Sequence, residues 1–140
     1  MSQFIMMKEW LKAKLGHHYR EHLVAITDPK EGLLRRIATE EKLFSLPVPS
    51  IVGGRFSVLS PVGLFPAALV GIDTEELLSG ARHLWGQLAE TSAIMENPAI
   101  LFAAVQRFFT LEGRPIHVMM AYADGLFCWA DWWRQLWAER

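Results

Sequence analysis

The sequence predicts an α/β fold: a short parallel sheet of about three strands, covered by helices on both faces. Runs rich in strand-forming residues at 22–27, 43–48 and 116–122 alternate with segments of helical periodicity. This alternation is typical of parallel sheets, because each crossover helix returns the chain to the same end of the sheet. With 140 residues and no internal repeat or linker, the chain is expected to form one domain, residues 1–140.

The first helix is expected over residues 3–15, ending before Gly16, because apolar side chains recur there at helical spacing. Its apolar stripe consists of Phe4, Met7, Leu11 and Leu15. After the first strand, Asp28 and Pro29 supply an N-cap and a first-turn proline. They predict a second helix that continues to about Glu41.

Residues 56–72 carry no charge at all. Ser60 and Pro61 stand where a helix would start, and the segment predicts a buried helix that ends near Val70. Its 17 residues, interrupted by glycine and proline, fall short of the roughly 20 apolar residues that cross a membrane. We therefore expect no membrane association.

The second half of the chain predicts three more helices from their start signals. They run from Asp73 or Thr74 to about Ala89, from Asn97-Pro98 to about Gly113, and from 125 to 138 after Asp124 as N-cap.

Composition excludes several classes of protein. Hydrophobic residues make up 51% of the chain and charged residues 21%, which favours a folded domain over disorder. The net charge of −1 and the lack of a basic cluster argue against nucleic acid binding. The single cysteine, Cys128, excludes an internal disulfide and fits a reducing cytoplasm, and the first residues do not resemble a signal peptide.

The most informative segment is Ser50–Gly63, in which Gly53 and Gly54 precede Arg55. Glycines permit positive φ and let a ligand approach the backbone, and arginine is a permanent cation suited to a phosphate or an oxyanion. A helix start directly after the loop would add free backbone N–H groups. The pattern is that of an anion site; the alternative is a plain Gly-Gly turn with a solvated arginine.

This segment resembles the signature of glucose-6-phosphate isomerases, a small or acidic residue followed by x-hydrophobic-Gly-Gly-Arg-aromatic-Ser. Every position of the signature is met from Ser50 to Gly63. The similarity continues through 24–41, 69–82 and 127–139, so that it covers nearly the whole chain.

The resemblance implies part of a sugar-isomerase (SIS) domain. It also implies a reaction, the interconversion of glucose 6-phosphate and fructose 6-phosphate in glycolysis and gluconeogenesis, with no metal and no cofactor. By resemblance, Arg55 is the catalytic cation beside the developing oxyanion, and Glu139 is the base that transfers the proton. Gly54 and Gln135 match positions that contact the substrate.

The family pattern continues beyond this chain. Relatives have serine where Arg140 stands, hold the phosphate with a loop that would precede Met1, and open the sugar ring with residues after the base. The chain therefore resembles a fragment of an isomerase. We expect a sugar phosphate as ligand, and a second copy or a complementary isomerase fragment as partner. The alternative is a non-catalytic SIS-type module that binds a sugar phosphate or packs against a partner.

Two other groups of residues call for an interpretation. His17, His18 and His22 lie across a turn, and no third type of metal ligand is near, so we expect a solvated loop rather than a metal site. A second group consists of Trp129, Trp132, Trp133 and Trp137. Their helical spacing favours packing in a core or an interface.

Overall fold

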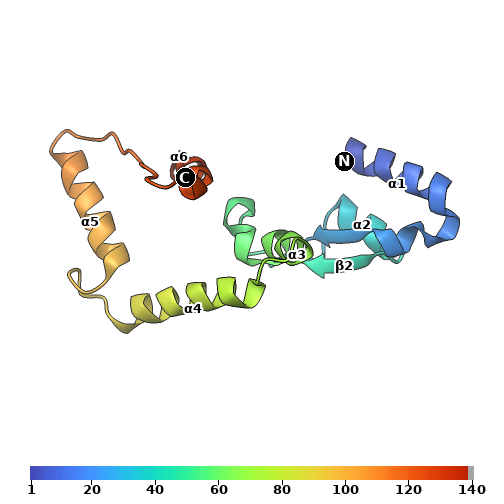
Figure 1. Ribbon diagram of the computed structural model, residues 1–140, viewed down its shortest axis with the longest axis horizontal. Coiled ribbons are helices and arrows are strands. Elements are labelled where there is room, and N and C mark those ends of the chain that lie inside the picture. The colour runs from blue at the N-terminus through green and yellow to red at the C-terminus, as the bar shows by residue number, and fades with distance from the viewer. Residues whose placement is uncertain (139–140) are drawn as a thin grey trace. The chain divides into compact units, whose positions relative to one another are not determined.

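The computed structural model of the chain describes residues 1–138. Chain contacts divide it into two compact units, the first from Met1 to Ile72 and the second beginning at Asp73. Figure 1 shows the elements in chain order. The described chain is mixed α/β and mostly helical, with a two-stranded parallel sheet. That the whole chain acts as a single domain stays a prediction.

The first unit contains both strands. Its elements are α1 (Ser2–Leu15), the 3-10 helix η1 (Gly16–His22), β1 (Val24–Thr27), α2 (Leu33–Glu40), β2 (Phe44–Pro47), the 3-10 helix η2 (Gly54–Leu59) and α3 (Pro61–Leu69). The elements of the second unit are α4 (Thr74–Glu90), α5 (Pro98–Leu111), the 3-10 turn η3 (Asp124–Leu126) and α6 (Phe127–Ala138).

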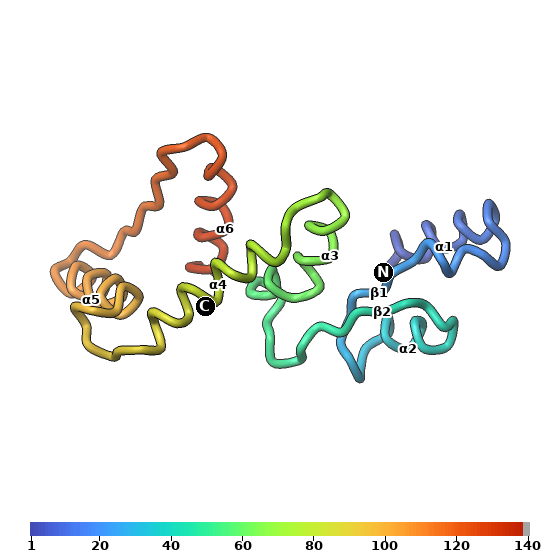
Figure 2. The backbone as a smooth tube through the Cα atoms, turned by 60° about the horizontal axis from the view of Figure 1, so that its bottom comes forward, coloured from blue at the N-terminus to red at the C-terminus, as the bar shows by residue number. Residues whose placement is uncertain are grey.

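The sheet forms by the expected route, since β1 leads through α2 into a parallel β2 (Figure 2). The register pairs Val24 with Phe44 and Ala25 with Ser45. Neighbouring residues of a strand point to opposite faces. Ala25 is only 4% exposed, whereas Val24 and Phe44 are 38% and 61% exposed. Helices therefore cover one face of this pair, and the expected cover on both faces is absent from the described chain.

The core of the first unit lies on the covered face. Its buried residues come from η1, β1, α2 and the turn before β2, and they are Tyr19, Ala25, Ala38 and Leu43. Around them pack Phe4, Leu11, Leu15, Leu23 and Leu34. The apolar stripe predicted for the first helix thus supplies part of the core, and Gly16 ends this helix with a positive φ of 57° as expected.

A polar contact joins the helices of this unit at the edge of the core. Lys8 Nζ donates to Glu41 Oε1 at 2.6 Å, and the Tyr19 hydroxyl donates to Glu41 Oε2 at 2.8 Å. The side chains of Lys8 and Glu41 are only 12% and 23% exposed. The hydrogen bond from Lys8 lowers the pKa of Glu41, and the same bond raises the pKa of Lys8.

The start of α2 differs from the prediction. Asp28 does not cap the helix; its Oδ1 accepts hydrogen bonds from the backbone N–H groups of Lys30 and Glu31, which lower the pKa of its carboxyl. The helix begins only at Leu33, after Gly32. An aspartate can close a local turn as readily as it caps a helix, and here the turn is formed.

Three other caps are where the sequence placed them. Ser60, Asp73 and Asn97 each accept hydrogen bonds from backbone N–H groups in the first turn of α3, α4 and α5. The prediction that the uncharged helix is buried is wrong, because α3 has no buried residue. At its end, Leu69 and Val70 are 71% and 75% exposed.

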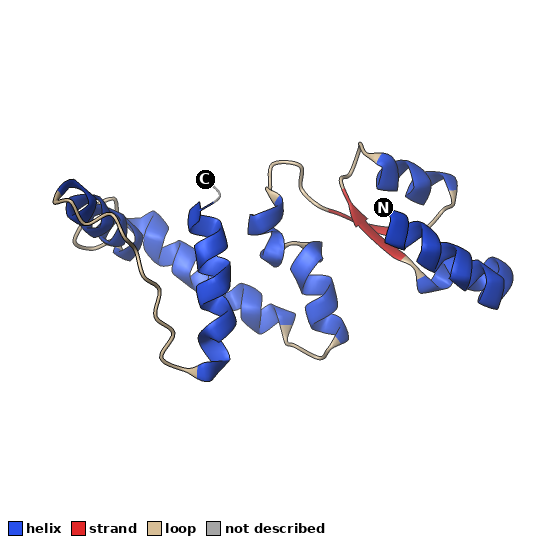
Figure 3. Cartoon of the chain, turned by 90° about the horizontal axis from the view of Figure 1, so that it is seen from above, coloured by secondary structure: helices blue, strands red, loops and turns tan. Residues whose placement is uncertain are grey.

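The third predicted strand is also wrong. Residues 114–122 run as irregular chain from α5 towards α6 (Figure 3). Ile116, Val118 and Tyr122 are 87%, 73% and 92% exposed. A run with strand propensity becomes a strand only when a neighbouring strand takes up its backbone hydrogen bonds, and the described chain provides none here. Asp124 does not cap the last helix either. It is the first residue of η3, whose N-cap is Ala123.

The contact at Glu41 yields a test of the first unit. Glu41→Gln removes a negative charge that accepts hydrogen bonds from two donors. The free energy of unfolding should therefore fall by about 1–2 kcal/mol at pH 7. The lowered pKa of Glu41 means that its contribution is present above the ordinary value of 4.5 and is lost as pH falls through the lowered value. The difference between the variant and the parent chain should therefore shrink at acid pH.

The measurement is urea denaturation followed by circular dichroism at low protein concentration. Glu9→Gln is the matched control, because Glu9 is 61% exposed and its bond to Lys12 is long, at 3.4 Å. This control should change stability by less than about 0.5 kcal/mol. Equal losses in both variants would show that the Lys8–Glu41 contact does not hold the helices together.

Candidate functional site

The Gly-Gly-Arg loop lies between the carboxyl end of β2 and the start of α3. A turn precedes it, in which the N–H of Val52 donates to the carbonyl of Pro49 at 2.9 Å. The chain then enters η2 at Gly54, where the N–H of Phe56 donates to the carbonyl of Gly53, also at 2.9 Å. Arg55 is thus the second residue of a 3-10 helix.

The two glycines do not use the conformations that only glycine can adopt. Among the described residues, the glycines with positive φ are elsewhere, and Gly53 has φ −63° and ψ 148°. The positive φ that glycine permits is therefore not used in this loop. The other role of glycine applies to Gly54, because a Cβ added there would meet no heavy atom within 4 Å. Open space beside this backbone is what the close approach of a ligand requires.

Two serines of the loop are buried and bonded within it. Ser57 is 3% exposed and donates from Oγ to the carbonyl of Gly54 at 2.5 Å. Ser60 is 9% exposed and donates from Oγ to the carbonyl of Ser57 at 2.6 Å. Ser60 stands at a helix start, as the sequence predicted, but the hydroxyl bonds of the two serines were not predicted. The signal was their spacing of three, which equals one turn of a 3-10 helix.

The helix start offers fewer free amides than expected. The N–H of Ser60 donates to the carbonyl of Ser57 at 2.9 Å, and that of Val62 donates to Ser60 Oγ at 3.3 Å. These two groups serve the loop itself. Any anion recognition at this place rests on Arg55, which is half-buried, and on the open backbone at Gly54.

One further glycine fixes how η2 meets α3. A Cβ on Gly63 would overlap the carbonyl oxygen of Val58 and come within 2.9 Å of its carbonyl carbon. Both are backbone atoms, which cannot rotate away as a side chain could. The first turn of α3 therefore lies directly against η2, and only glycine fits at position 63.

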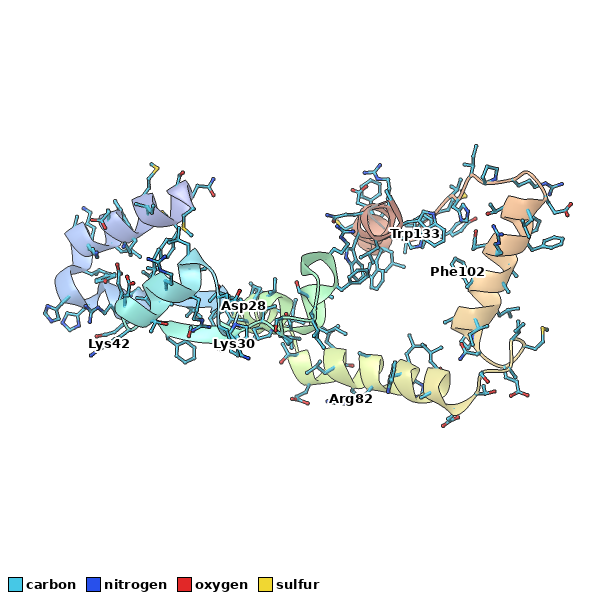
Figure 4. The ribbon with its side chains drawn as sticks, turned by 180° about the vertical axis from the view of Figure 1, so that it is seen from behind. Asp28, Lys30, Lys42, Arg82, Phe102 and Trp133 are labelled. Carbon is cyan, nitrogen blue, oxygen red and sulfur yellow. The ribbon has the colours of Figure 1, made fainter. Side chains whose placement is uncertain are left out.

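The remaining predicted residues belong to the end of the chain. Gln135 lies exposed on α6 in the second unit, and Glu139 falls outside the described residues. Figure 4 shows the indole of Trp133 projecting from the same helix. It stacks on Trp137 at 5.5 Å between ring centroids, and Trp129 meets Trp132 edge to face at 5.1 Å. The tryptophans thus pack in pairs along α6.

The second unit contains an open pocket of about 450 Å³ between α5 and α6. His117 lines it with its ring 4.7 Å from that of Trp137, and its Nδ1 is buried without a hydrogen-bond partner in the described chain. None of the predicted site residues lines this pocket.

Two further features are absent from residues 1–138. Within that range no group of three or more histidine, cysteine, aspartate or glutamate side chains could hold a metal ion. His18 instead shares a hydrogen bond of 2.9 Å with Glu21, which lowers the pKa of that carboxyl. No helix in the same range is long and apolar enough to cross a membrane.

Fold and loop together define a mixed α/β protein in which a Gly-Gly-Arg turn leads into a serine-capped helix. A profile of the family described as phosphoglucose isomerase matches residues 1–140. The chain belongs to the phosphoglucose isomerase family, and the two-stranded α/β unit is a partial version of that fold.

Similar proteins include glucose-6-phosphate isomerases of Carboxydothermus hydrogenoformans and Rubrobacter xylanophilus. They are 45% and 48% identical to this chain over 139 and 141 residues, which is 99% of this chain but 30% and 32% of theirs. A crystal structure of a hypothetical protein from Thermus thermophilus superposes on 96% of the chain with a TM-score of 0.86 and 40% identity. The chain spans about 30% of the length of the curated relatives it matches.

The contact at Gly63 gives a test of the loop. Gly63→Ala should destabilise the first unit by about 1–3 kcal/mol, because an added methyl overpacks a site bounded by backbone. Gly80→Ala is the control: Gly80 lies inside α4 with open space around its Cα, so alanine should stabilise that helix by about 0.5–1 kcal/mol. Urea denaturation followed by circular dichroism measures both. A neutral Gly63→Ala would mean that η2 and α3 do not lie this close.

Proposed function

We propose that this chain is part of a glucose-6-phosphate isomerase and contributes two groups of its active site. Arg55 supplies the positive charge beside the oxyanion, and Glu139 transfers the proton. Gly54 and Gln135 contact the sugar phosphate. These roles are carried over from the family motif onto the residues that match it.

The observation that carries the proposal is the loop around Arg55. It follows the carboxyl end of a parallel strand, which is where open α/β sheets bind their ligands. The backbone at Gly54 is open, and buried serine hydroxyls fix the turn from which Arg55 projects. A solvated arginine on a plain Gly-Gly turn would not need buried hydroxyls beneath it.

The chemistry suits these residue types. Aldose–ketose isomerisation moves a proton between neighbouring carbons, and the intermediate enediolate carries negative charge on oxygen. A carboxylate held near both carbons can take the proton from one and return it to the other. A fixed cation at the oxygen lowers the energy of the transition state, because the charge it stabilises develops only during the reaction.

The activity needs groups outside these 140 residues. By the family resemblance, the groups that hold the phosphate and open the ring would come from segments outside these residues. The chain spans about 30% of the length of the curated relatives it matches. We therefore expect the chain to work with the remaining parts of an isomerase, either in one polypeptide or as a complementary fragment. This limited coverage of the relatives also favours a second candidate, a non-catalytic module that binds a sugar phosphate.

The chain by itself should turn over fructose 6-phosphate at background level and still bind sugar phosphates weakly. We expect millimolar affinity at best, about −4 kcal/mol, because few contacts are present. Titration with 6-phosphogluconate, followed by NMR, should shift the Gly54 and Arg55 amides first. Arg55→Ala should abolish these shifts, whereas Arg36→Ala, an exposed arginine of α2, should leave them unchanged.

Two outcomes would contradict this proposal. Shifts confined to the histidine-rich η1 would place the anion site elsewhere. Turnover of even about 1 s⁻¹, low for an enzyme, that disappears in both Arg55→Ala and Glu139→Gln would show that the isolated chain is a complete catalyst.

The exposed apolar residues of the first unit predict association. Phe44 on the open sheet face and Leu69 and Val70 after the loop are each more than half exposed. Apolar surface of this kind favours self-association or a partner. Size-exclusion chromatography with light scattering at several concentrations should show oligomers or aggregates. A single 15.9 kDa species that unfolds cooperatively above about 60 °C would contradict this and favour a self-sufficient module.

A further inference from the structure

The family motif assigns no role to the two buried serines of the Arg55 loop, Ser57 and Ser60. In a 3-10 helix, residues three apart lie one above the other. Gly54 and Ser57 are one turn apart in η2, and Ser60 follows one turn later at its end. Hydroxyls at this spacing can reach the carbonyl of the preceding turn, and both serines do so.

The bond from Ser57 acts on the peptide unit that begins Arg55. Its hydroxyl holds the carbonyl of Gly54 at 2.5 Å, and that carbonyl shares a planar peptide group with the N–H of Arg55. Fixing one end of the plane fixes the other, and so restrains the N–Cα bond of Arg55, from which the arginine side chain leaves the backbone. Gly54 itself has no side chain that could restrain the plane.

Ser60 continues the restraint into α3. Its hydroxyl donates to the carbonyl of Ser57 at 2.6 Å and accepts from the N–H of Val62 at 3.3 Å. The orientation of the Gly54–Arg55 peptide is thereby tied to the first turn of a regular helix. Runs of 3-10 helix longer than about four residues are uncommon, and η2 has six, so support from side chains is expected.

We infer that Ser57 is a positioning residue for Arg55, acting through the Gly54 carbonyl and backed by Ser60. The inference rests on the proposed function for its consequence in binding, but the restraint itself is a property of the loop. Groups that recognise a reacting substrate must be held within about 0.5 Å of their working place, and a shift of about 1 Å can cost roughly a hundredfold in rate. The hydroxyl of Ser57 provides this precision from a buried position, without touching the ligand.

The test compares Ser57→Ala, which removes the hydroxyl, with Ser57→Thr, which keeps it. Ser79→Ala, at an exposed position of α4, is the matched control. The first readout needs no ligand: the {1H}-15N heteronuclear NOE at the Arg55 amide and Nε, with the amides of β1 as reference. The second is the dissociation constant for 6-phosphogluconate, measured by NMR on the full chain at a temperature where every variant is folded.

Ser57→Ala should lower the NOE at Arg55 while that of β1 stays constant, and should weaken 6-phosphogluconate binding about tenfold, or ~1.4 kcal/mol. Ser57→Thr should stay within about twofold of the parent chain, and so should Ser79→Ala. If Ser57→Ala does not fold, Ser57→Cys replaces it with the same expectation, because a thiol is only a weak donor.

An unchanged NOE at Arg55 in Ser57→Ala overturns the inference, and so does equal loss of order in Ser57→Ala and Ser57→Thr, since the hydroxyl would then not matter. A drop in NOE that extends equally through β1 also overturns it, because it marks general loosening of the unit. If the parent chain binds no 6-phosphogluconate at all, the proposed function fails, and the ligand-free NOE still decides the role of Ser57.

Discussion

The first unit depends on the two hydrogen bonds that the carboxylate of Glu41 accepts. Glu41 follows the last residue of α2, and it accepts hydrogen bonds from Lys8 of α1 and from Tyr19 of η1. The small core, four buried residues with a ring of half-buried ones, is closed on one side by this contact. Because α2 is also the crossover between the two strands, the contact that fixes α2 against α1 also fixes the sheet.

The position of the Arg55 loop follows from that sheet. β2 ends at Pro47, and the chain reaches η2 after one turn, so the loop begins from a strand whose register is set by pairing with β1. On its other side the loop is joined to α3 through the Ser60 cap and the close approach of Gly63 to Val58. A loop anchored at both ends can hold an arginine in one place, which suits the electrostatic role proposed for Arg55.

The exposure of apolar residues is consistent with a chain that spans only part of the length of its relatives. An uncharged helix such as α3 is normally buried, yet it has no buried residue here, and the face of the sheet that carries Phe44 is open. The chain spans about 30% of the length of its curated relatives. In the proposal made above, the remaining parts of an isomerase would cover these surfaces and complete the site.

The sequence by itself determined what depends on near neighbours. The start signals at Ser60, Asp73 and Asn97 predicted three helix caps, because a cap involves only the next two or three residues. The Gly-Gly-Arg motif also predicted the family, since the order of residue types needs no three-dimensional information.

Tertiary structure decided whatever depends on residues far apart or on competition between local alternatives. Lys8 and Glu41 are 33 residues apart, and no periodicity links them. The run at 116–122 has the composition of a strand but no partner in the described chain, so its hydrogen bonds cannot form a ladder. Asp28 closes a local turn instead of capping a helix. Gly53 and Gly54 have ordinary backbone conformations, in a loop that is closed by serine hydroxyl bonds. Strand pairing and burial depend on residues that are far apart in the sequence. A local sequence pattern therefore indicates only the helix or strand propensity of its own segment.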